Sequence, residues 1–448
     1  MAADYVNTLT DVIIMDTINH KGEDYPVTEI RESAFLGNTT IQNLTIGANV
    51  TVVGANAFSS CTSLENITIK DHSNKDKIKI KENAFINCSM LKGLDTNDSV
   101  SSIGDYAFSK CSALSTLTLD EMVESIGKNA FSYCSNLKSV ALGNSIKYIR
   151  EGTFYKCGQL TSIELNNAYT IEANAFGGCD LREVNIPASM IRIEPGAFLD
   201  NDRIEITVDN QNDKYLAYKG FLLEKDKENY RIITSSYNVG SNDEEYEFGF
   251  NENDAYPISE ITFGAIANRN SLKSIKFGPS LVSIASLAFR GCSNLEYVDL
   301  SKTSFTSTAG SAFAYCYNLD RFAESTDERH SINGHLNCVT ALSFKDSGIK
   351  KLFLDEEDTL TSIQPVAFSE MHELVQITLP DSISHMFGSI LKGCEKLGNG
   401  VDFGIIYEGS YEDWQKMEYR TDEWKDGIEG TVKFHFAKDN ITRAVRDL

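Results

Sequence analysis

The sequence lacks any apolar run long enough to cross a bilayer, so we expect no direct insertion into a membrane. Its first residues, MAADYVNTL, contain neither a basic n-region nor an apolar h-region. Its last residues, ITRAVRDL, contain no recognisable sorting or lipidation motif. Two accounts stay open: an export signal and an anchor were removed from this chain, or the protein has none.

Positive charge is also scarce. The 448 residues include 41 Lys and Arg against 64 Asp and Glu, which gives a formal net charge of −23. Nucleic acids and anionic membrane surfaces both require a basic face on the protein that binds them. The charge therefore argues against both partners, and it favours solubility of the chain.

Catalytic and metal-binding motifs are missing as well. The sequence contains no G-x-S-x-G, H-E-x-x-H, P-loop, G-x-G-x-x-G or C-x-x-C motif. His330, His335 and Cys338 lie close together, but the spacing H-x4-H-x2-C matches no closed zinc site. The acidic run from Asp355 to Asp358 is typical of a solvated turn. We predict a protein that is not an enzyme and needs no cofactor or metal, unless an attached domain carries chemistry.

What the sequence does contain is a repeat with a period close to 23 residues. Each repeat has an apolar anchor that usually follows Ala, with Ile or Val five residues before it and Leu or Ile six residues after it. Periods between 20 and 50 residues are typical of solenoids, in which each coil buries its apolar face only by stacking on its neighbours. The anchors are Phe35, Phe58, Phe85, Phe108, Phe131, Phe154, Phe176, Phe198, Ile266, Phe289, Phe313, Phe344, Phe368 and Leu391.

The pattern inside a repeat predicts the structure of one coil. The L-x-x-I-x-L segment alternates like a strand with one buried face, whereas the N-A-F-x-x-C segment is long enough only for a turn of helix. We therefore expect each coil to contain a strand, a turn, a short strand and a helical turn.

Nine of the ten cysteines stand three residues after an anchor, and only Cys338 lies outside this register. Equivalent residues of stacked coils lie about 4.7 to 4.9 Å apart, so these thiols should form an internal column. This spacing exceeds twice the S–S bond length of about 2.05 Å, which argues against disulfides between neighbours. We interpret the column as small buried side chains.

The repeat words closely resemble those of a known family. NAFSSCTSLENITI, YAFSKCSALSTLTL, NAFSYCSNLKSVAL and LAFRGCSNLEYVDL are similar to the BspA-type leucine-rich repeats of bacterial and protist cell-surface proteins. The opening DVIIMDTINHKGEDYPVTEIRESAF and the late IIYEGSYEDWQKMEYR resemble the ends of family members. The resemblance implies an elongated leucine-rich repeat solenoid, β-rich with short helical turns (an α/β repeat), with about 23 residues per coil.

This resemblance divides the chain into five parts. We expect an N-terminal capping segment over residues 1–34, repeats over 35–198 and 261–397, and a C-terminal cap over 398–448. Between the two repeat blocks, residues 199–260 form a variant long repeat whose sequence predicts a β-hairpin around EKDKEN. Insertions of this kind often carry binding in solenoids, although a purely structural variant coil is the alternative.

The C-terminal segment has its own signals. Ser410 and Asp413 have the spacing of a helix capping box, and Trp414 and Trp424 supply apolar bulk. A solenoid must cover its last coil to avoid open-ended association, so we expect this segment to act as a lid.

The family resemblance also implies a function. Its members are mostly known or presumed adhesins, so we expect a monomeric, non-enzymatic protein, secreted or on a cell surface, that binds a protein or glycan on a host or neighbouring cell. The alternative is a structural spacer or scaffold, intracellular or attached to a domain absent from this chain.

Alternation along the L-x-x-I-x-L strands indicates which residues face outward and are candidates for binding. Tyr297 and Phe353 are the aromatic members of this mostly small and polar row, and aromatic residues are enriched in interface hot spots. Tyr218 and Tyr230 are added because they lie on the predicted hairpin. The candidates are Thr116, Thr118, Ser162, Glu164, Glu183, Asn185, Tyr218, Tyr230, Ser274, Lys276, Tyr297, Asp299, Lys351 and Phe353.

Overall fold

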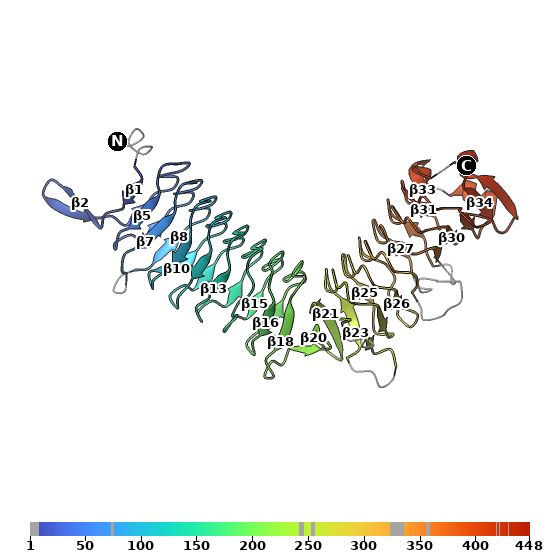
Figure 1. The fold of residues 1–448 in the computed structure, drawn as a ribbon, viewed down its shortest axis with the longest axis horizontal. Coiled ribbons are helices and arrows are strands. Elements are labelled where there is room, and N and C mark those ends of the chain that lie inside the picture. Colours follow the sequence, from blue (N-terminus) through green and yellow to red (C-terminus); the bar gives the residue numbers. More distant parts are fainter. Residues whose placement is uncertain are drawn as a thin grey trace. The chain divides into compact units, whose positions relative to one another are not determined.

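The computed structural model describes residues 9–72, 76–241, 246–251, 256–322, 336–354, 359–417, 419–420, 422–428 and 430–448. The chain forms two compact units, Met1–Ala217 and Tyr218–Leu448. Each unit is a stack of coils of the kind that the repeat predicts, with strands of equivalent position following one another along the stack (Figure 1). The boundary between the units falls inside the predicted variant segment.

Two rows of parallel strands run along the first unit. The first row contains the L-x-x-I-x-L strands, which are β1 (Asp11–Ile13), β5 (Asn43–Ile46), β7 (Asn66–Ile69), β9 (Gly93–Asp95), β11 (Thr116–Thr118), β13 (Ser139–Ala141), β16 (Glu183–Ile186) and β18 (Glu205–Val208). The second row contains β4 (Glu29–Ile30), β6 (Val52–Val53), β8 (Ile78–Ile80), β10 (Val100–Ile103), β12 (Ser125–Ile126), β14 (Tyr148–Ile149), β15 (Thr170–Ile171) and β17 (Arg192–Ile193). A hairpin of β2 (Thr17–His20) and β3 (Glu23–Pro26) extends from the N-terminal end of this unit (Figure 1).

The strand register follows the sequence repeat. Leu44 pairs with Ile67, and Leu94 pairs with Leu117, so equivalent apolar residues lie side by side in successive coils. These side chains point into the stack, where they are at most 4% exposed for Leu44, Leu94 and Leu117. The period of the sequence therefore becomes the register of the sheets, because a slip of one residue would turn the apolar side chains to solvent.

The segments expected to be helical turns form a different structure. In the coil of Phe58, the N–H groups of Asn56, Phe58 and Ser60 donate to carbonyl oxygens of the next coil, and only the intervening N–H groups close turns within the coil. Asn56 and Ser60 adopt left-handed φ values of 56° and 59°, and the same two positions are left-handed at all fourteen anchors. In a helix these N–H groups would donate to carbonyl oxygens of the same coil. Here they donate to the next coil and so join neighbouring coils.

The anchors and cysteines fill the interior of the stack. The eight phenylalanines from Phe35 to Phe198 stack ring on ring, with centroids 4.9 to 5.7 Å apart and planes within 9° of parallel. All ten cysteines are free, and the nine that follow anchors are buried. Each of these nine thiols donates to the carbonyl oxygen of the anchor residue one coil earlier, at 3.0 to 3.3 Å. The predicted cysteine column is confirmed, and its thiols have hydrogen-bond partners.

The second unit repeats the arrangement. Its L-x-x-I-x-L row contains β22 (Glu247–Phe248), β24 (Ser274–Phe277), β26 (Tyr297–Asp299), β28 (Lys351–Phe353), β30 (Gln376–Leu379), β32 (Ile405–Tyr407), β34 (Lys433–Phe436) and the antiparallel β35 (Ile441–Ala444). The other row contains β20 (Phe221–Asp226), β21 (Asn229–Ser235), β23 (Ile258–Ile261), β25 (Ser283–Ile284), β27 (Cys338–Val339), β29 (Ser362–Ile363), β31 (His385–Met386) and β33 (Tyr419–Arg420).

The predicted hairpin is present as β20 and β21, which pair antiparallel from Phe221–Ser235 to Asp226–Asn229. Its first arm is shorter than the alternation suggested, because Lys219 and Gly220 adopt left-handed φ values and separate β20 from β19 (Tyr215–Tyr218). Strand β21 also pairs parallel with β23. The hairpin is therefore built into the sheet of the second unit as a variant coil.

The C-terminal segment contains the predicted capping box. Helix α1 (Tyr411–Lys416) begins after Ser410, whose Oγ accepts from the Asp413 N–H while the Asp413 carboxylate accepts from the Ser410 N–H. Trp414 and Trp424 are each 1% exposed and contact each other with ring centroids 5.3 Å apart. Two 3-10 helices, η1 (Asp422–Lys425) and η2 (Val445–Asp447), complete the segment.

The two classes of cysteine should differ in reactivity. Burial raises the pKa of Cys61, Cys179, Cys292 and Cys394 to about 12, so their thiolate fraction at neutral pH falls about a thousandfold below that of an ordinary thiol. Cys338, in β27, is only partly buried. Alkylation of the native protein, followed by mass spectrometry, should modify Cys338 first, whereas denaturation without reductant should release all ten thiols. Equal labelling of the column, or any cystine pair, would contradict this prediction.

Candidate functional site

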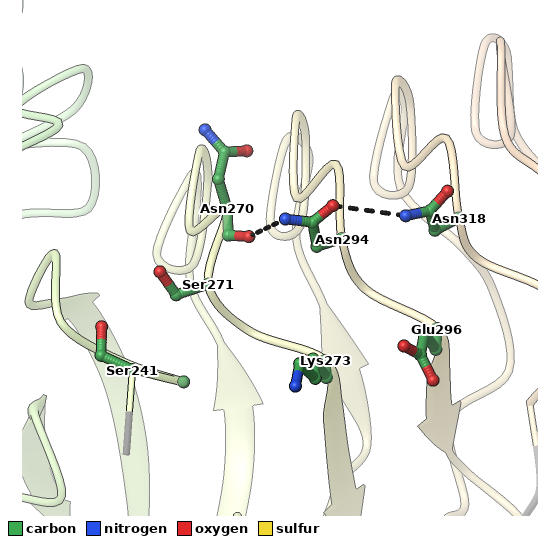
Figure 2. Close-up of a pocket in the computed structure, with 8 residues that line it drawn as sticks. Ser241, Asn270, Ser271, Lys273, Asn294, Glu296 and Asn318 are labelled. Atoms are coloured by element: carbon green, nitrogen blue, oxygen red, sulfur yellow. Dashed lines mark hydrogen bonds between the residues drawn. The ribbon is translucent and has the colours of Figure 1, made fainter. Parts of the chain in front are cut away.

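The second unit carries an open polar groove of about 550 Å³. It is lined by Gly240, Ser241, Asn270, Ser271, Lys273, Asn294, Glu296 and Asn318. Three asparagines come from three successive coils, just after the anchors Ile266, Phe289 and Phe313. Lys273 and Glu296 lie below them, immediately before strands β24 and β26 (Figure 2).

Hydrogen bonds hold the three asparagines in a row (Figure 2). The Nδ2 of Asn294 donates to the backbone carbonyl of Asn270 at 2.8 Å, and the Nδ2 of Asn318 donates to the Oδ1 of Asn294 at 3.3 Å. The Oδ1 of Asn270 accepts from the Oγ of Ser293 at 2.8 Å. Because each asparagine is fixed by its neighbour, a ligand meets amides that are already oriented, and little side-chain entropy is lost on binding.

The lining determines what the groove can hold. Among the described residues, the lining side chains are amides, hydroxyls, one ammonium and one carboxylate, and none is aliphatic or aromatic. Amides both donate and accept hydrogen bonds, as sugar hydroxyls do. Protein interfaces instead concentrate their energy in buried aromatic and aliphatic anchors. The chemistry of the groove therefore suits a hydroxyl-rich ligand.

The predicted binding residues of the first unit lie where alternation placed them. All six are exposed. They lie on β11, on β16, or on the segment around Ser162, which pairs with Glu183 of β16 in an isolated β-bridge. Together they form a polar row of hydroxyl, amide and carboxylate groups. These residues are Thr116, Thr118, Ser162, Glu164, Glu183 and Asn185.

In the second unit the predicted binding residues on the strands are less exposed to solvent. Ser274, Tyr297, Lys351 and Phe353 are half-buried. Lys276 pairs with Glu247 at 3.0 Å and lies over the ring of Phe250, so its charge is already engaged within the unit.

The expected exposure of Asp299 is wrong, since this residue is only 3% exposed. Its Oδ1 accepts from the backbone N–H of Ser301 at 3.0 Å and from the Ser301 hydroxyl at 2.6 Å. Strand β26 ends at Asp299, so the carboxylate closes the following turn and does not point to solvent. Thr378, which pairs with Phe353 on the neighbouring strand, is likewise only 7% exposed.

The hairpin tyrosines come together. Tyr218 and Tyr230 both contact the ring of Tyr256, with centroids 4.6 and 5.0 Å away, and both are half-buried. They form an aromatic cluster at one edge of the second unit. Its part in binding stays a prediction.

Other candidate chemistry can be placed only in part. His330, His335 and the run from Asp355 to Asp358 lie outside the described residues. Within the described ranges, no group of three or more His, Cys, Asp or Glu side chains is arranged to hold a metal ion. Nor does the described part of the chain contain a helix long and apolar enough to cross a membrane.

Comparison with known families agrees with the repeat pattern. The model of the BspA type leucine-rich repeat region, in six copies, matches residues 15–92, 78–205, 255–333 and 339–403. The chain belongs to this family. No curated protein matches the sequence.

Solved structures of other leucine-rich repeat proteins show the same fold. The chain is similar to a leucine-rich cell surface protein of Faecalibacterium prausnitzii, with 26% identity and a TM-score of 0.62 over 94% of this chain and 95% of that one. A leucine-rich repeat protein of Eubacterium ventriosum matches with 19% identity and a TM-score of 0.56, over 74% of this chain and 81% of that one. One from Bacteroides ovatus matches with 21% identity and a TM-score of 0.50, over 89% and 91%.

Sequence reasoning about this leucine-rich repeat chain missed the groove. It looked for outward residues on the strands, whereas the asparagines lie on the loops that enter the strands. A signal was available, because Asn270, Asn294 and Asn318 recur two residues before Leu272 and one residue before Leu295 and Leu319. Only the structure shows that these loops stack and that the amides bond to one another.

Proposed function

We propose that this protein is a non-enzymatic binding protein, secreted or on a cell surface, that holds a glycan of a host or neighbouring cell in the groove of its second unit. The observation that carries this proposal is the row of Asn270, Asn294 and Asn318, fixed across three coils above Lys273 and Glu296. Similarity to a protein described as a leucine-rich cell surface protein supports the location.

The size of the groove supports a small ligand segment. Its volume of about 550 Å³ lies within the range of about 300 to 1,000 Å³ that is usual for ligand sites. Among the residues drawn in Figure 2, no hydrogen bond reaches the Nδ2 of Asn270 or the Oδ1 of Asn318, so both atoms can contact a ligand. The strand row and the Tyr218–Tyr230 cluster would then extend the contact to longer chains or to a carrier protein.

A glycan array followed by titration calorimetry tests the groove. Asn294→Ala removes both hydrogen bonds that join Asn294 to the other two asparagines, and Glu296→Gln removes the one carboxylate among the described residues that line the groove. Each should weaken the binding of the array hit by about tenfold, because a hydrogen bond to the ligand is lost. Asn144→Ala is the matched control, since Asn144 is an exposed asparagine of the first unit that bonds to Glu121. Unchanged affinity in both groove variants, with melting temperature preserved, would disprove the groove assignment.

Other outcomes separate the alternatives. If groove variants bind normally but Tyr297→Ala with Phe353→Ala loses binding, the strand row is the recognition surface. If only trimming of the β20–β21 turn matters, recognition belongs to the hairpin. If the array gives no ligand while a partner domain is found in the full gene, the spacer interpretation replaces binding.

A further inference from the structure

A column of exposed residues in the first unit alternates between lysine and tyrosine. Lys110, Tyr133 and Lys156 each stand two residues after an anchor, and each donates its backbone N–H to the next coil. Their left-handed φ values, 63°, 61° and 58°, carry a conformational cost that Gly37 and Gly178 avoid at the same position. The backbone conformation serves the stacking of coils, and the long side chains at these three positions are exposed on the surface.

The side chains form one cluster. Tyr133 and Tyr155 meet edge to face with ring centroids 5.6 Å apart. The Nζ of Lys156 lies 5.6 Å from the Tyr133 centroid and 5.4 Å from the Tyr155 centroid. Tyr133 is 43% exposed, so the cluster presents an aromatic face beside a cation.

The next coil is shaped to accept this cluster. A Cβ atom on Gly177 would lie 3.1 Å from the Tyr155 ring, and one on Gly178 would lie 3.2 Å from the Cγ of Lys156. These contacts are tighter than ordinary packing. Glycine at both positions therefore lets Tyr155 and Lys156 lie against the backbone of the next coil.

Five coil segments around and before the cluster contain no acidic residue, in a strongly acidic protein. Residues 59–63, 86–90, 109–113, 132–136 and 155–159, which we call the acid-free band, contain no Asp or Glu although the chain has 64 of them. Two carboxylates of nearby coils are paired: Glu151 with Lys128 at 3.0 Å, and Asp180 with Arg182 at 3.6 Å. Within the band, Gln159 donates to Asn136 at 3.2 Å and supplies amide groups.

We propose that the acid-free band binds an anionic sugar, with Lys156 contacting its carboxylate or sulfate and Tyr133 stacking on its ring. The C–H face of a sugar ring suits the negative face of an aromatic ring, and an ammonium forms charge-assisted hydrogen bonds with an anionic group. A large polyanion such as nucleic acid or a lipid surface would also meet the acidic remainder of the protein and be repelled. This site is separate from the groove and does not depend on it.

The experiment is titration of the intact protein with three kinds of probe: sialyllactose and tri-galacturonate for a carboxylate, a sulfated chondroitin disaccharide for a sulfate, and lactose as the neutral partner. At least one acidic probe should bind, and lactose should bind at least tenfold more weakly. Lys156→Met keeps the apolar stem and should weaken binding about tenfold. Tyr133→Asn removes the ring but suits the left-handed backbone, so it should weaken binding without loss of folding.

Lys79→Met is the matched control. Lys79 is an exposed lysine on β8, in the second strand row of the first unit, and it lies outside the acid-free band. It should bind the acidic probe as the unmodified protein does. Asn294→Ala, in the groove, should also leave this binding unchanged, so failure here and failure of the groove can be told apart. The proposal is overturned if no acidic probe binds, if lactose binds equally well, or if Lys156→Met and Tyr133→Asn both retain full affinity.

Discussion

Deletion of residues 405–448 is expected to yield aggregated or partly melted protein. The deletion removes β32 and β34, which continue the parallel sheet beyond β30, together with the antiparallel β35 that ends it. It would leave β30 as an open edge, and unpaired edges associate with other chains. It also removes the buried Trp414 and Trp424, each 1% exposed. Size-exclusion chromatography and a melting curve would show the loss.

A point variant tests the same segment without opening an edge. Trp414→Ala should lower the free energy of unfolding of the second unit by about 3 to 5 kcal/mol, the usual cost of truncating a buried tryptophan. Lys416→Ala, on the same helix, removes only an exposed pair with Glu412 and should cost less than about 0.5 kcal/mol. A soluble, monomeric deletion protein with an unchanged melting temperature would show that residues 405–448 are not a cap.

Cys157→Ser is expected to lower the free energy of unfolding by about 1 to 3 kcal/mol, because it buries a hydroxyl without an adequate partner. The Sγ of Cys157 donates to the Phe131 carbonyl at 3.2 Å, and a shorter C–O bond would not reach as far. The chain contains its own precedent. Ser347 stands three residues after the anchor Phe344, and its buried Oγ has no hydrogen-bond partner among the described residues. Denaturant unfolding measures the change.

The opposite exchange, serine to cysteine, tests the same hydrogen bond in the other direction. Ser347→Cys should raise stability, because a thiol at this position can donate to the Phe313 carbonyl as the other nine thiols do to theirs. Cys338→Ser, outside the column and only partly buried, should change the free energy of unfolding by less than about 0.5 kcal/mol. If Cys157→Ser is as stable as the unmodified protein, the column contributes no specific hydrogen bonding.

The repeat made most of the fold predictable. Anchors such as Phe58 and Phe131, the alternation around Leu117 and the position of each cysteine are local patterns, and stacking converts them directly into buried columns. The capping box at Ser410 and Asp413 was predictable for the same reason, since its partners are three residues apart. The conformation of the N-A-F-x-x-C segment was not, because its alternate N–H groups bond to another coil and no short window of sequence contains that partner.

The candidate site was less predictable. Alternation placed Thr116 and Glu183 correctly, but it failed at Asp299, where a turn with Ser301 replaces the strand pattern. It also gave no sign that Tyr218 and Tyr230 would share Tyr256, which is distant from both along the chain. Pairs of this kind depend on which loops come together after folding.

The sequence by itself determined the family, the coil period, the buried anchors and cysteines, and the acidic character of the chain, because each is a property of one repeat or of composition. Only the tertiary structure decided that Asn270, Asn294 and Asn318 form one hydrogen-bonded row and that Lys156 lies beside Tyr133 and Tyr155. The physical reason is that a binding surface on a solenoid is assembled from side chains one period apart. Their contacts depend on rotamers and hydrogen bonds between coils, which the repeat pattern does not specify.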